Sequence, residues 1–272
     1  MSSYVLSNDE LRRVQLIQLE MLCEVDRICK KNNIKYNIIA GTLLGAVRHE
    51  GFIPWDDDAD VAFLRSEYDK FLQAIKKDLD KEKFYFQDHR NTEGYRWGYG
   101  KLRRNDTLFL REGQENMPYE QGVFIDIFPL DNVPDNKVAR IFTNIHCFFI
   151  RKCMWAPIGK KQSPKVIGRL GYGLLEKIPD KWLFGHYDKY IEKTKKRKSS
   201  WVRILTYPTP NSNYGYKKKW YENSNQIIFE EKTFSGIKEW DEYLNFKFGD
   251  YMQLPKESER KRHSVTKLEI NV

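Results

Sequence analysis

The sequence predicts an α/β (α+β) fold: a mixed sheet core flanked by helices, then a helical insertion, then a C-terminal tail that folds back onto the core. Three observations predict it. Strand-like and helix-like apolar patterns alternate through about the first 130 residues. A mostly helical, basic stretch follows at 136–199, and short strand patterns return after it. With 272 residues, 40% of them hydrophobic, the chain can bury a substantial core.

The first element is an amphipathic helix. Ser7 with Glu10 three residues later forms a capping-box pattern, and apolar residues then recur at helical spacing from Leu11 to Ile28. Asn32 and Asn33 are expected to end this helix.

The later elements follow from the same patterns. Strands are expected at 35–41, 59–63, 83–89, 95–104, 106–112, 122–131, 201–207 and 225–231, and helices at 42–49, 66–79 and 238–249. Prolines at 157, 164 and 179 interrupt the helical stretch. We therefore expect a catalytic core at 1–134, a helical basic region at 135–200 that contacts membrane or acceptor, and a C-terminal α/β segment at 201–272 that completes the site.

The charge of the chain favours an anionic partner. The net charge is +9, from 47 basic and 38 acidic residues, which suits a phosphate-bearing substrate, nucleic acid or a membrane surface; a merely basic soluble surface is the alternative. The pair Lys160–Lys161 and the run 195–198 are expected to meet anionic lipid, and the amphipathic middle to lie in the membrane interface. No signal peptide or membrane span is indicated, so we expect a cytoplasmic protein, peripheral at the inner face of the cell membrane.

An acidic cluster is the main candidate for chemistry. In a strand, Asp58 and Asp60 face the same side, and two carboxylates so close need neutralisation, which a divalent cation provides. Asp126 is a lone acid in an apolar strand and is the natural third ligand. The alternatives are a solvated acidic turn and, for Asp126, a core acid paired with an arginine. Asp56 and Asp57 lie in the approach turn, where helix capping, support of the ligands and plain solvation stay open.

A Gly-Thr turn precedes the acids. Backbone N–H groups at the start of the following helix can bind phosphate oxygens, Gly41 permits close approach, and the Thr42 hydroxyl adds a donor. Arg48 can add a guanidinium fork for the same phosphate.

Together these motifs resemble the nucleotidyltransferase superfamily, and within it the LicD family. The stretch "GTLLGAVRHEGFIPWDDDADV" is closely similar to the LicD signature, and "GKLRR", "GVFIDIFPLD" and "FGDYMQLP" follow in the family's order. Thr42 departs from the Ser or Gly of many superfamily members but is usual in LicD proteins. The resemblance spans residues 6–263 and is only weakly diagnostic in the helical middle.

This resemblance implies an activity. LicD-like proteins transfer a substituted phosphate such as phosphorylcholine from a CDP-activated donor, for example CDP-choline, to a sugar hydroxyl of a cell-surface glycan, and CMP is released. The glycan can be a teichoic acid, a lipopolysaccharide or a capsule, supplied as a lipid-linked precursor. The resemblance also implies Mg²⁺ or Mn²⁺, as two ions, held by Asp58, Asp60 and Asp126. Choline, ethanolamine, glycerol and ribitol share the CDP handle and are not distinguished by the signature.

Further residues are candidates for substrate binding. Lys101 and Arg103 lie two apart in a strand, so they are expected to grip the diphosphate from one face. A cationic headgroup is expected to meet aromatic rings, and the tail is expected to fold over the donor phosphates or the glycan. The aromatic candidates are Trp55, Trp97 and Tyr99, and the tail candidates are Asp250, Arg260 and His263. A packed core for the rings and a frayed basic end for the tail are the alternatives.

Three other functions are open at this stage. The same metal site serves a nucleotidyltransferase that adds NMP to a sugar phosphate or an antibiotic. A nucleic-acid-binding protein would use the positive charge, but the dense acids argue against it and no nucleic acid is expected. A catalytically inactive metal-binding scaffold is the third possibility.

Overall fold

The computed structural model describes residues 3–209, 211–260 and 262–272. The helices are α1 Asn8–Lys31, α2 Ala40–His49, α3 Arg65–Asp78, α4 Lys137–Met154, α5 Ala156–Gln162, α6 Val166–Leu175, α7 Asp180–Lys195, α8 Lys219–Glu222 and α9 Trp240–Phe248, with a 3₁₀ turn at Glu257–Glu259. The strands are β1 Asn37–Ile38, β2 Asp60–Leu64, β3 Phe84–Gln87, β4 Gly100–Arg104, β5 Thr107–Arg111, β6 Phe124–Val133, β7 Trp201–Arg203, β8 Tyr216–Lys217, β9 Ser224–Phe229, β10 Lys232–Ile237 and β11 Val265–Ile270.

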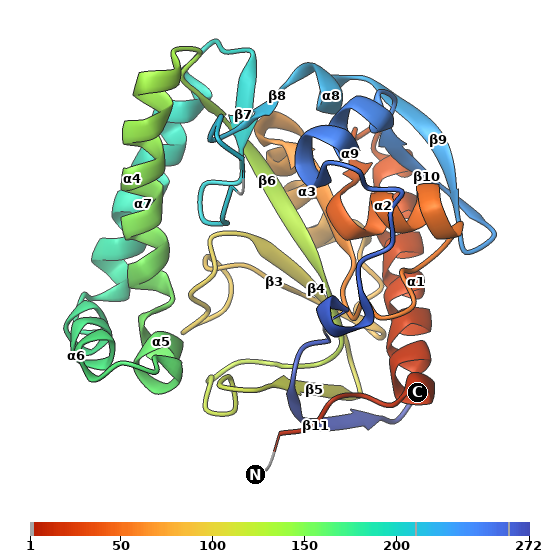
Figure 1. Cartoon of the computed structure of the whole chain (residues 1–272), viewed down its shortest axis with the longest axis horizontal. Coiled ribbons are helices and arrows are strands. Elements are labelled where there is room, and N and C mark those ends of the chain that lie inside the picture. The colour runs from red at the N-terminus through yellow and green to blue at the C-terminus, as the bar shows by residue number, and fades with distance from the viewer. Residues whose placement is uncertain (1–2, 210, 261) are drawn as a thin grey trace.

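A mixed sheet forms the centre of the fold and confirms the predicted class. Within the described residues it has nine strands, seven of them in the order β3-β4-β6-β2-β1-β10-β9, with β7 and β8 continuing from β6. The pairs β2–β6 and β1–β10 are parallel, and the others are antiparallel. Strand β6 is central because it pairs with β2, β4 and β7, which places the strand between the N-terminal strands and the C-terminal segment (Figure 1).

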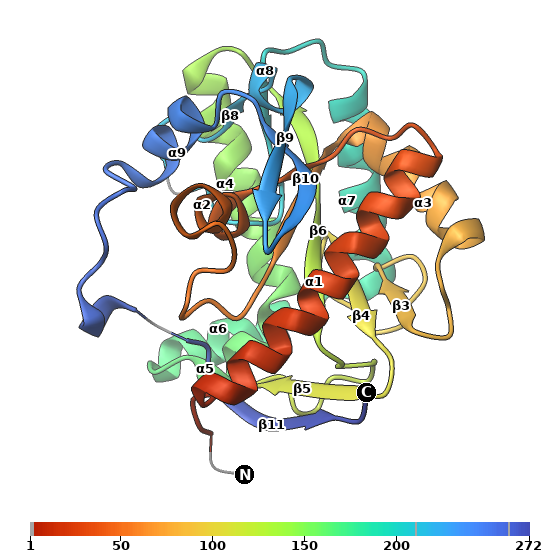
Figure 2. The same cartoon turned by 90° about the vertical axis from the view of Figure 1, so that its right-hand side faces the viewer.

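Helix α1 covers one face of this sheet, as Figure 2 shows. The predicted capping box is confirmed: the Ser7 hydroxyl accepts from the Glu10 amide at 3.2 Å, and the Glu10 carboxylate accepts from the Ser7 amide at 2.8 Å. The predicted end is confirmed too, since Asn32 is the C-terminal cap. The buried side of α1 joins the main hydrophobic core, together with α3 and the strands.

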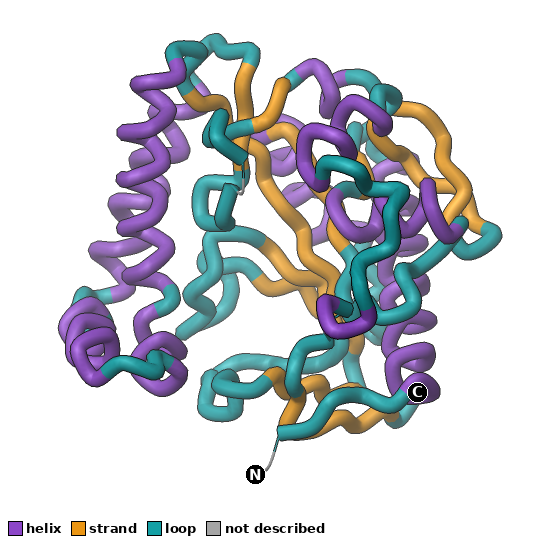
Figure 3. The backbone as a smooth tube through the Cα atoms, viewed as in Figure 1, coloured by secondary structure: helices purple, strands orange, loops and turns teal. Residues whose placement is uncertain are grey.

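Helices α4 to α7 form a separate layer on the other side of the sheet (Figures 2 and 3). Their buried side chains make a second hydrophobic cluster, which includes Cys147, Ile150, Leu183, Tyr187 and Ile191. All four cysteines of the chain are free thiols. In the part of the chain that the structure describes, no helix combines the length and the hydrophobicity needed to cross a bilayer.

The tail folds back onto the core, as predicted. Strand β11 pairs antiparallel with β5 to form a second, two-stranded sheet. Tyr4 bridges Val265, so both ends of the chain meet beside α1.

Several boundaries predicted from the sequence are wrong. The strand expected at 35–41 ends at Ile38, and Gly41 lies in the first turn of α2, because Ala40 takes a φ of 50° and turns the chain sharply into the helix. Strand β2 begins at Asp60, so Asp58 lies just before the strand. The strand expected at 95–104 begins only at Gly100, and the one expected at 201–207 ends at Arg203. Strands β8, β10 and β11 have no counterpart in the sequence prediction.

Candidate active site

Strands β2 and β6 bring two acids side by side. In their parallel register Asp60 stands opposite Asp126, and the Asp126 amide donates to the Ala59 carbonyl at 2.9 Å. Paired residues on neighbouring strands project to the same face, so the two carboxylates are neighbours. The hydroxyl of Thr42 accepts from the Asp60 amide at 2.8 Å and fixes the start of β2. Parallel pairing therefore connects two motifs that lie 66 residues apart in the sequence.

The carboxylates crowd one another. Burial raises the pKa of Asp60 well above its usual range, and Asp58, Asp126 and Asp56 raise it further. The pKa of Asp56 is raised in the same way, by burial and then by Asp58 and Asp57. The pKa of Asp58 is raised by burial, although Arg111 opposes that shift. This concentration of negative charge is unfavourable unless a cation compensates it.

Two protein cations face the acids. Lys101 forms a buried ion pair with Asp126, and its ammonium lies 3.4 Å from the centre of the Phe124 ring. Burial lowers the pKa of Lys101 to about 8, although the charge of Asp126 opposes that shift. Arg111 contacts Asp57 at 3.1 Å and Asp58 at 3.6 Å. Two cations beside the carboxylates of Asp56, Asp57, Asp58, Asp60 and Asp126 leave an excess of negative charge.

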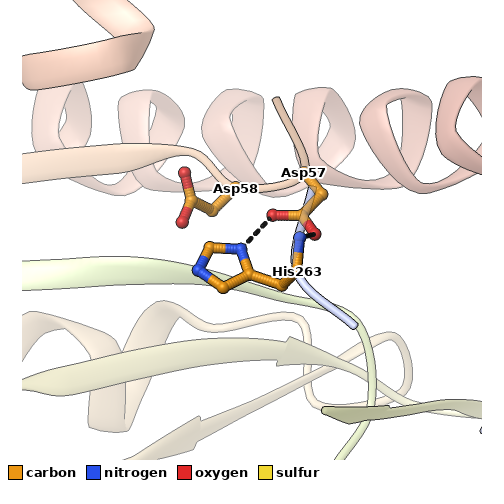
Figure 4. Close-up of side chains that lie close together, drawn as sticks. All are labelled: Asp57, Asp58 and His263. Atoms are coloured by element: carbon orange, nitrogen blue, oxygen red, sulfur yellow. Dashed lines mark hydrogen bonds and ion pairs between the residues drawn. The ribbon is translucent and has the colours of Figure 1, made fainter. Parts of the chain in front are cut away.

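Asp57 plays a different part from its neighbours. It is 1% exposed, and it accepts from the His263 amide at 3.1 Å and from His263 Nδ1 at 2.7 Å (Figure 4). Burial alone raises the pKa of Asp57, but the hydrogen bond from His263 and the charge of Arg111 outweigh it and lower the pKa. Asp57 therefore anchors the C-terminal tail to the acidic cluster, which answers the question that the sequence left open for this residue.

Asp56 lies against the start of α2. A Cβ added to Gly41 would fall 2.5 Å from Asp56 Oδ2, so the carboxylate approaches a position that only glycine leaves open. The predicted phosphate-binding turn thus has an acid beside it, and the Thr42 hydroxyl is already hydrogen-bonded to β2. Neither Gly41 nor Thr42 lines the cavity described next.

A cavity of about 570 Å³ opens beside the acids. Its charged lining includes Asp58, Asp126, Lys101, Arg111 and His263. Its aromatic lining is a chain of rings, with centroids 5.3 Å apart for Trp155 and Trp97, 6.2 Å for Trp97 and Tyr99, and 6.2 Å for Tyr99 and Tyr207. The Lys101 ammonium lies 5.6 Å from the Tyr99 ring centre, so the charged lining of the cavity and its aromatic lining meet there. Five sequence-predicted residues besides Asp126 line this cavity: Asp58, Trp97, Tyr99, Lys101 and His263.

A larger cavity, of about 1120 Å³, lies between α3, β3 and α7. It contains none of the residues predicted for the site. Size alone would favour it, but the smaller cavity holds the converging acids and cations, and these are what chemistry requires.

Two predicted basic residues serve the framework of the protein. Arg103 is buried and donates to the Gln87 side chain at 2.5 Å and to the Gly122 carbonyl at 2.7 Å. It therefore connects β4 with β3 and with the segment before β6. Arg48 donates to the Tyr251 carbonyl at 2.6 Å. Neither guanidinium lines the cavity.

Trp55, Arg260 and Asp250 also lie elsewhere. The guanidinium of Arg260 stacks 4.6 Å above the Trp55 ring, and both residues line a different cavity of about 900 Å³ beside α1. Asp250 is exposed after the end of α9. Of the predicted tail residues, His263 is the one that the structure brings to the acids.

Arg111, Trp155 and Tyr207 were not found from the sequence. Arg111 ends an ordinary strand pattern, and its guanidinium rests 4.8 Å from the Phe124 ring centre. Trp155 follows a helix, and Tyr207 lies in a loop after β7. No local signal marks these three residues, because their role depends on long-range packing.

Two sets of described residues are candidates for holding a divalent cation. Asp58, Asp60 and Asp126 offer only carboxylate oxygens, the ligands that Mg²⁺ prefers. Asp57, Asp58 and His263 form the second set, with one potential ligand atom each, all within 4.8 Å of one another. The carboxylate of Asp57 is already engaged by Arg111 and His263. Among the described residues, the second set is the one whose potential ligand atoms all lie within 4.8 Å of one another, whereas the crowded negative charge that a cation would relieve lies on the first set.

A sheet with paired acids on neighbouring strands beside a short Gly-Thr helix resembles a nucleotidyltransferase-type domain. Residues 33–157 match the family model described as LicD/FKTN/FKRP, nucleotidyltransferase domain. This match covers a little less than half of the chain and shows a similarity to the LicD family, the family that the sequence motifs resemble.

Individual relatives extend this similarity. The lipopolysaccharide cholinephosphotransferase LicD of Haemophilus influenzae is 29% identical over 275 residues, which cover 94% of this chain and 96% of that protein. An uncharacterized protein of Rickettsia typhi is 44% identical over 66 residues, 24% of this chain and 21% of that protein. One of Rickettsia prowazekii is 48% identical over 48 residues, 18% of each. The first similarity spans nearly the whole chain and therefore includes most of the helical middle.

Proposed function

We propose that this protein transfers a substituted phosphate, most readily phosphorylcholine, from a CDP-activated donor to a sugar hydroxyl of a cell-surface glycan and releases CMP. The observation that carries the proposal is the composition of one cavity, which combines acids and cations for a phosphate with the rings of Trp97, Tyr99, Trp155 and Tyr207 for a quaternary ammonium. The near full-length similarity to a lipopolysaccharide cholinephosphotransferase supports it.

We assign the metal site to Asp58, Asp60 and Asp126. Mg²⁺ or Mn²⁺, as one or two ions, would there neutralise the diphosphate and lower the pKa of the attacking hydroxyl. Lys101 is poised to exchange its carboxylate partner for a donor phosphate, and Arg111 adds a second cation on the same side. Phosphoryl transfer depends mainly on positioning and charge neutralisation, and these residues provide both.

His263 is the side chain best placed to accept the proton of the acceptor hydroxyl. Its Nδ1 is engaged by Asp57, which leaves Nε2 for another partner, and the ring lines the cavity. Such an orienting carboxylate is the usual support of a histidine base. Asp126 is the alternative acceptor, but in this structure its carboxylate is held by Lys101.

The aromatic rings suit the headgroup. A trimethylammonium group binds over ring faces, and an uncharged glycerol or ribitol group gains no comparable interaction. On this ground we favour choline over glycerol and ribitol.

The decisive experiment supplies two nucleotides separately. With CDP-choline, Mg²⁺ and a glycan acceptor, we expect CMP release and choline on the glycan in equal amounts. With CTP and a sugar phosphate, we expect no pyrophosphate. Pyrophosphate release without choline transfer would instead establish the alternative, an NMP transferase, which the nucleotidyltransferase domain also supports.

Removal of one aromatic ring is expected to weaken choline recognition selectively. Trp155→Leu should raise the KM for CDP-choline about tenfold, in line with a desolvated cation–π contact, and change the KM for CDP-glycerol much less. Steady-state kinetics with both donors measure this ratio. Trp55→Leu is the comparison, because that ring lies in the cavity beside α1; if it shifts the ratio and Trp155→Leu does not, the headgroup binds elsewhere.

Gly41→Ala is expected to reduce kcat/KM by up to about 100-fold, because it displaces the Asp56 carboxylate beside the proposed ligands, and a misplacement of roughly 1 Å near a site has effects of that size. The new Cβ would fall 2.5 Å from Asp56 Oδ2, so the carboxylate of Asp56 has to move. Gly185→Ala, in α7, adds the same methyl group where nothing lies within 4 Å and should leave kcat/KM unchanged. Equal kinetics for the two variants would show that Asp56 has no part in the site.

A further inference from the structure

Helix α4 exposes a complete apolar face. Phe142 is 68% exposed and Ile145 is 58% exposed, and the face also contains Val138, Ile141, Phe148 and Phe149. The opposite side of the helix, with Cys147 and Ile150, packs into the second hydrophobic cluster. The helix is therefore apolar on both sides, which is unusual for an element that has solvent on one of them.

Helix α6 extends this surface. None of its residues is buried, and Val166, Ile167, Leu170 and Leu174 are each at least 65% exposed at helical spacing. The helix is attached through Tyr172, whose hydroxyl accepts from Lys152 of α4 at 2.7 Å. Lys152 also lies 5.2 Å from the ring centre of Phe148, which belongs to the exposed face of α4. Lys152 therefore contacts both this face and Tyr172 of α6. We call these ten exposed apolar residues of α4 and α6 the α4–α6 surface.

The charge around this surface has one sign. Residues 137–175 contain eight Lys or Arg and no Asp or Glu, so this segment alone carries +8 of the net +9 of the chain. Lys160 is paired with Glu176, whereas Lys161, Lys165 and Arg169 are exposed on α5, α6 and their connection. Basic residues beside an exposed apolar face are typical of helices that lie in the interface of an anionic bilayer.

The same helices form a wall of the cavity. Arg151, Lys152 and Trp155 at the end of α4, and Gln162 at the end of α5, line it. Arg151 and Lys152 also lie over the Phe148 ring, at 5.4 and 5.2 Å from its centre. A partner that binds the α4–α6 surface is therefore separated from the cavity only by helix α4.

We propose that the α4–α6 surface docks on an anionic lipid bilayer, with its apolar side chains among the headgroups and its lysines and arginines on lipid phosphates. The wall of the cavity formed by α4 and α5 is then the wall nearest the membrane, which suits an acceptor presented on a lipid. Docking is independent of the proposed transfer reaction, because it requires only this surface.

Charge and apolarity together select this partner. A second copy of the chain in a symmetric dimer would bring the same basic segment against itself, with eight positive charges on each side. A nucleic acid would match the charge but would not bury an apolar face of two helices. A bilayer with anionic headgroups satisfies both.

The test is flotation of the full chain with vesicles of phosphatidylcholine alone and with added phosphatidylglycerol. We expect binding to the anionic vesicles at low salt and weaker binding at high salt. The double variant Ile145→Asp/Phe149→Asp should lower the partition coefficient at least about tenfold, since charged groups replace side chains placed in the interface. Ile228→Asp is the matched control: it is 63% exposed, lies on β9 and should bind as the wild type does.

Three results would overturn the proposal. The first is no binding of the wild type to anionic vesicles at low salt. The second is equal binding by the double variant. The third is a wild-type dimer in light scattering that the double variant converts to a monomer, which would assign the surface to a second copy. Repeating the flotation with an inactive Asp60→Asn variant separates this question from the proposed reaction, because that variant should bind as well as the wild type.

Discussion

Asp60→Asn is expected to lower kcat/KM for transfer from CDP-choline about 10³-fold or more, and at the same time to raise the thermal stability of the metal-free protein. The two effects have one cause. Asp60 is partly buried beside Asp58, Asp126 and Asp56, and burial and these neighbours raise its pKa well above the usual range. Its charge is therefore unfavourable in the folded chain, and an amide of the same shape removes that charge.

The sign follows from proton linkage. A carboxyl group whose pKa is higher in the folded than in the unfolded state destabilises the fold when it is ionised. This cost appears as the pH rises above the unfolded value, and it is present in full above the folded value. Asp60→Asn should thus raise the melting temperature most at neutral to alkaline pH, and least in acid, where Asp60 is protonated in both states.

Thermal unfolding with EDTA and with Mg²⁺ measures the effect. Wild-type protein should gain stability with Mg²⁺, because a ligand of the folded state stabilises it by mass action, and Asp60→Asn should gain much less. Asp69→Asn removes the same charge from a pair with Lys195 at the surface and should change neither activity nor the response to Mg²⁺. A lower melting temperature for Asp60→Asn in EDTA, or retained activity, would refute the assignment of this carboxylate to a metal.

The sequence was most informative where the signals are local. The capping box of Ser7 and Glu10 predicted the start of α1 correctly, because both hydrogen bonds form within one turn. Asp126 stands out in the sequence because an acid in an apolar strand is rare, and Asp58 and Asp60 stand out because two carboxylates two residues apart need neutralisation. That Asp60 and Asp126 lie close together follows from the sequence only if their two strands are neighbours in the sheet. The parallel pairing of β2 with β6 shows that they are.

Long-range packing decided the rest. Nothing near Trp155 or Tyr207 indicates that their rings meet those of Trp97 and Tyr99, since the contacts join the end of α4, a loop after β7 and the approach to β4. Arg103 and Lys101 share a strand face, but Arg103 is taken by Gln87 and Gly122, which no single sequence reveals. Asp56 and Asp57 look alike in the sequence, and the positions of His263, Arg111 and Gly41 in the fold distinguish them.

Asp131→Ala is expected to cost about 3–5 kcal/mol of folding free energy, the usual consequence of breaking one side of a buried ion pair. Asp131 is 0% exposed, and it accepts from Arg65 Nε at 2.8 Å and from Arg65 Nη2 at 2.6 Å. Thr194 of α7 donates to the same carboxylate at 2.9 Å. The pair joins α3, β6 and α7, so its loss leaves a buried guanidinium without its partner where two layers of the fold meet.

Equilibrium unfolding in urea measures this loss, and a double variant isolates its origin. Arg65→Met/Asp131→Leu removes both charges and should recover most of the stability, because two apolar side chains of similar volume need no compensation. If the double variant is as unstable as Asp131→Ala, the loss comes from packing and not from the orphaned arginine.

Asp126 and Asp131 belong to one strand but lie five residues apart, and alternation in a strand places them on opposite faces. The two possible fates of an acid in an apolar strand, a core pair with arginine and a ligand in a site, are thus both realised in β6. Asp131 has its arginine and stabilises the fold. Asp126 is paired with Lys101 but lies beside the carboxylates of Asp58 and Asp60. Its face of the strand is the one that lines the cavity.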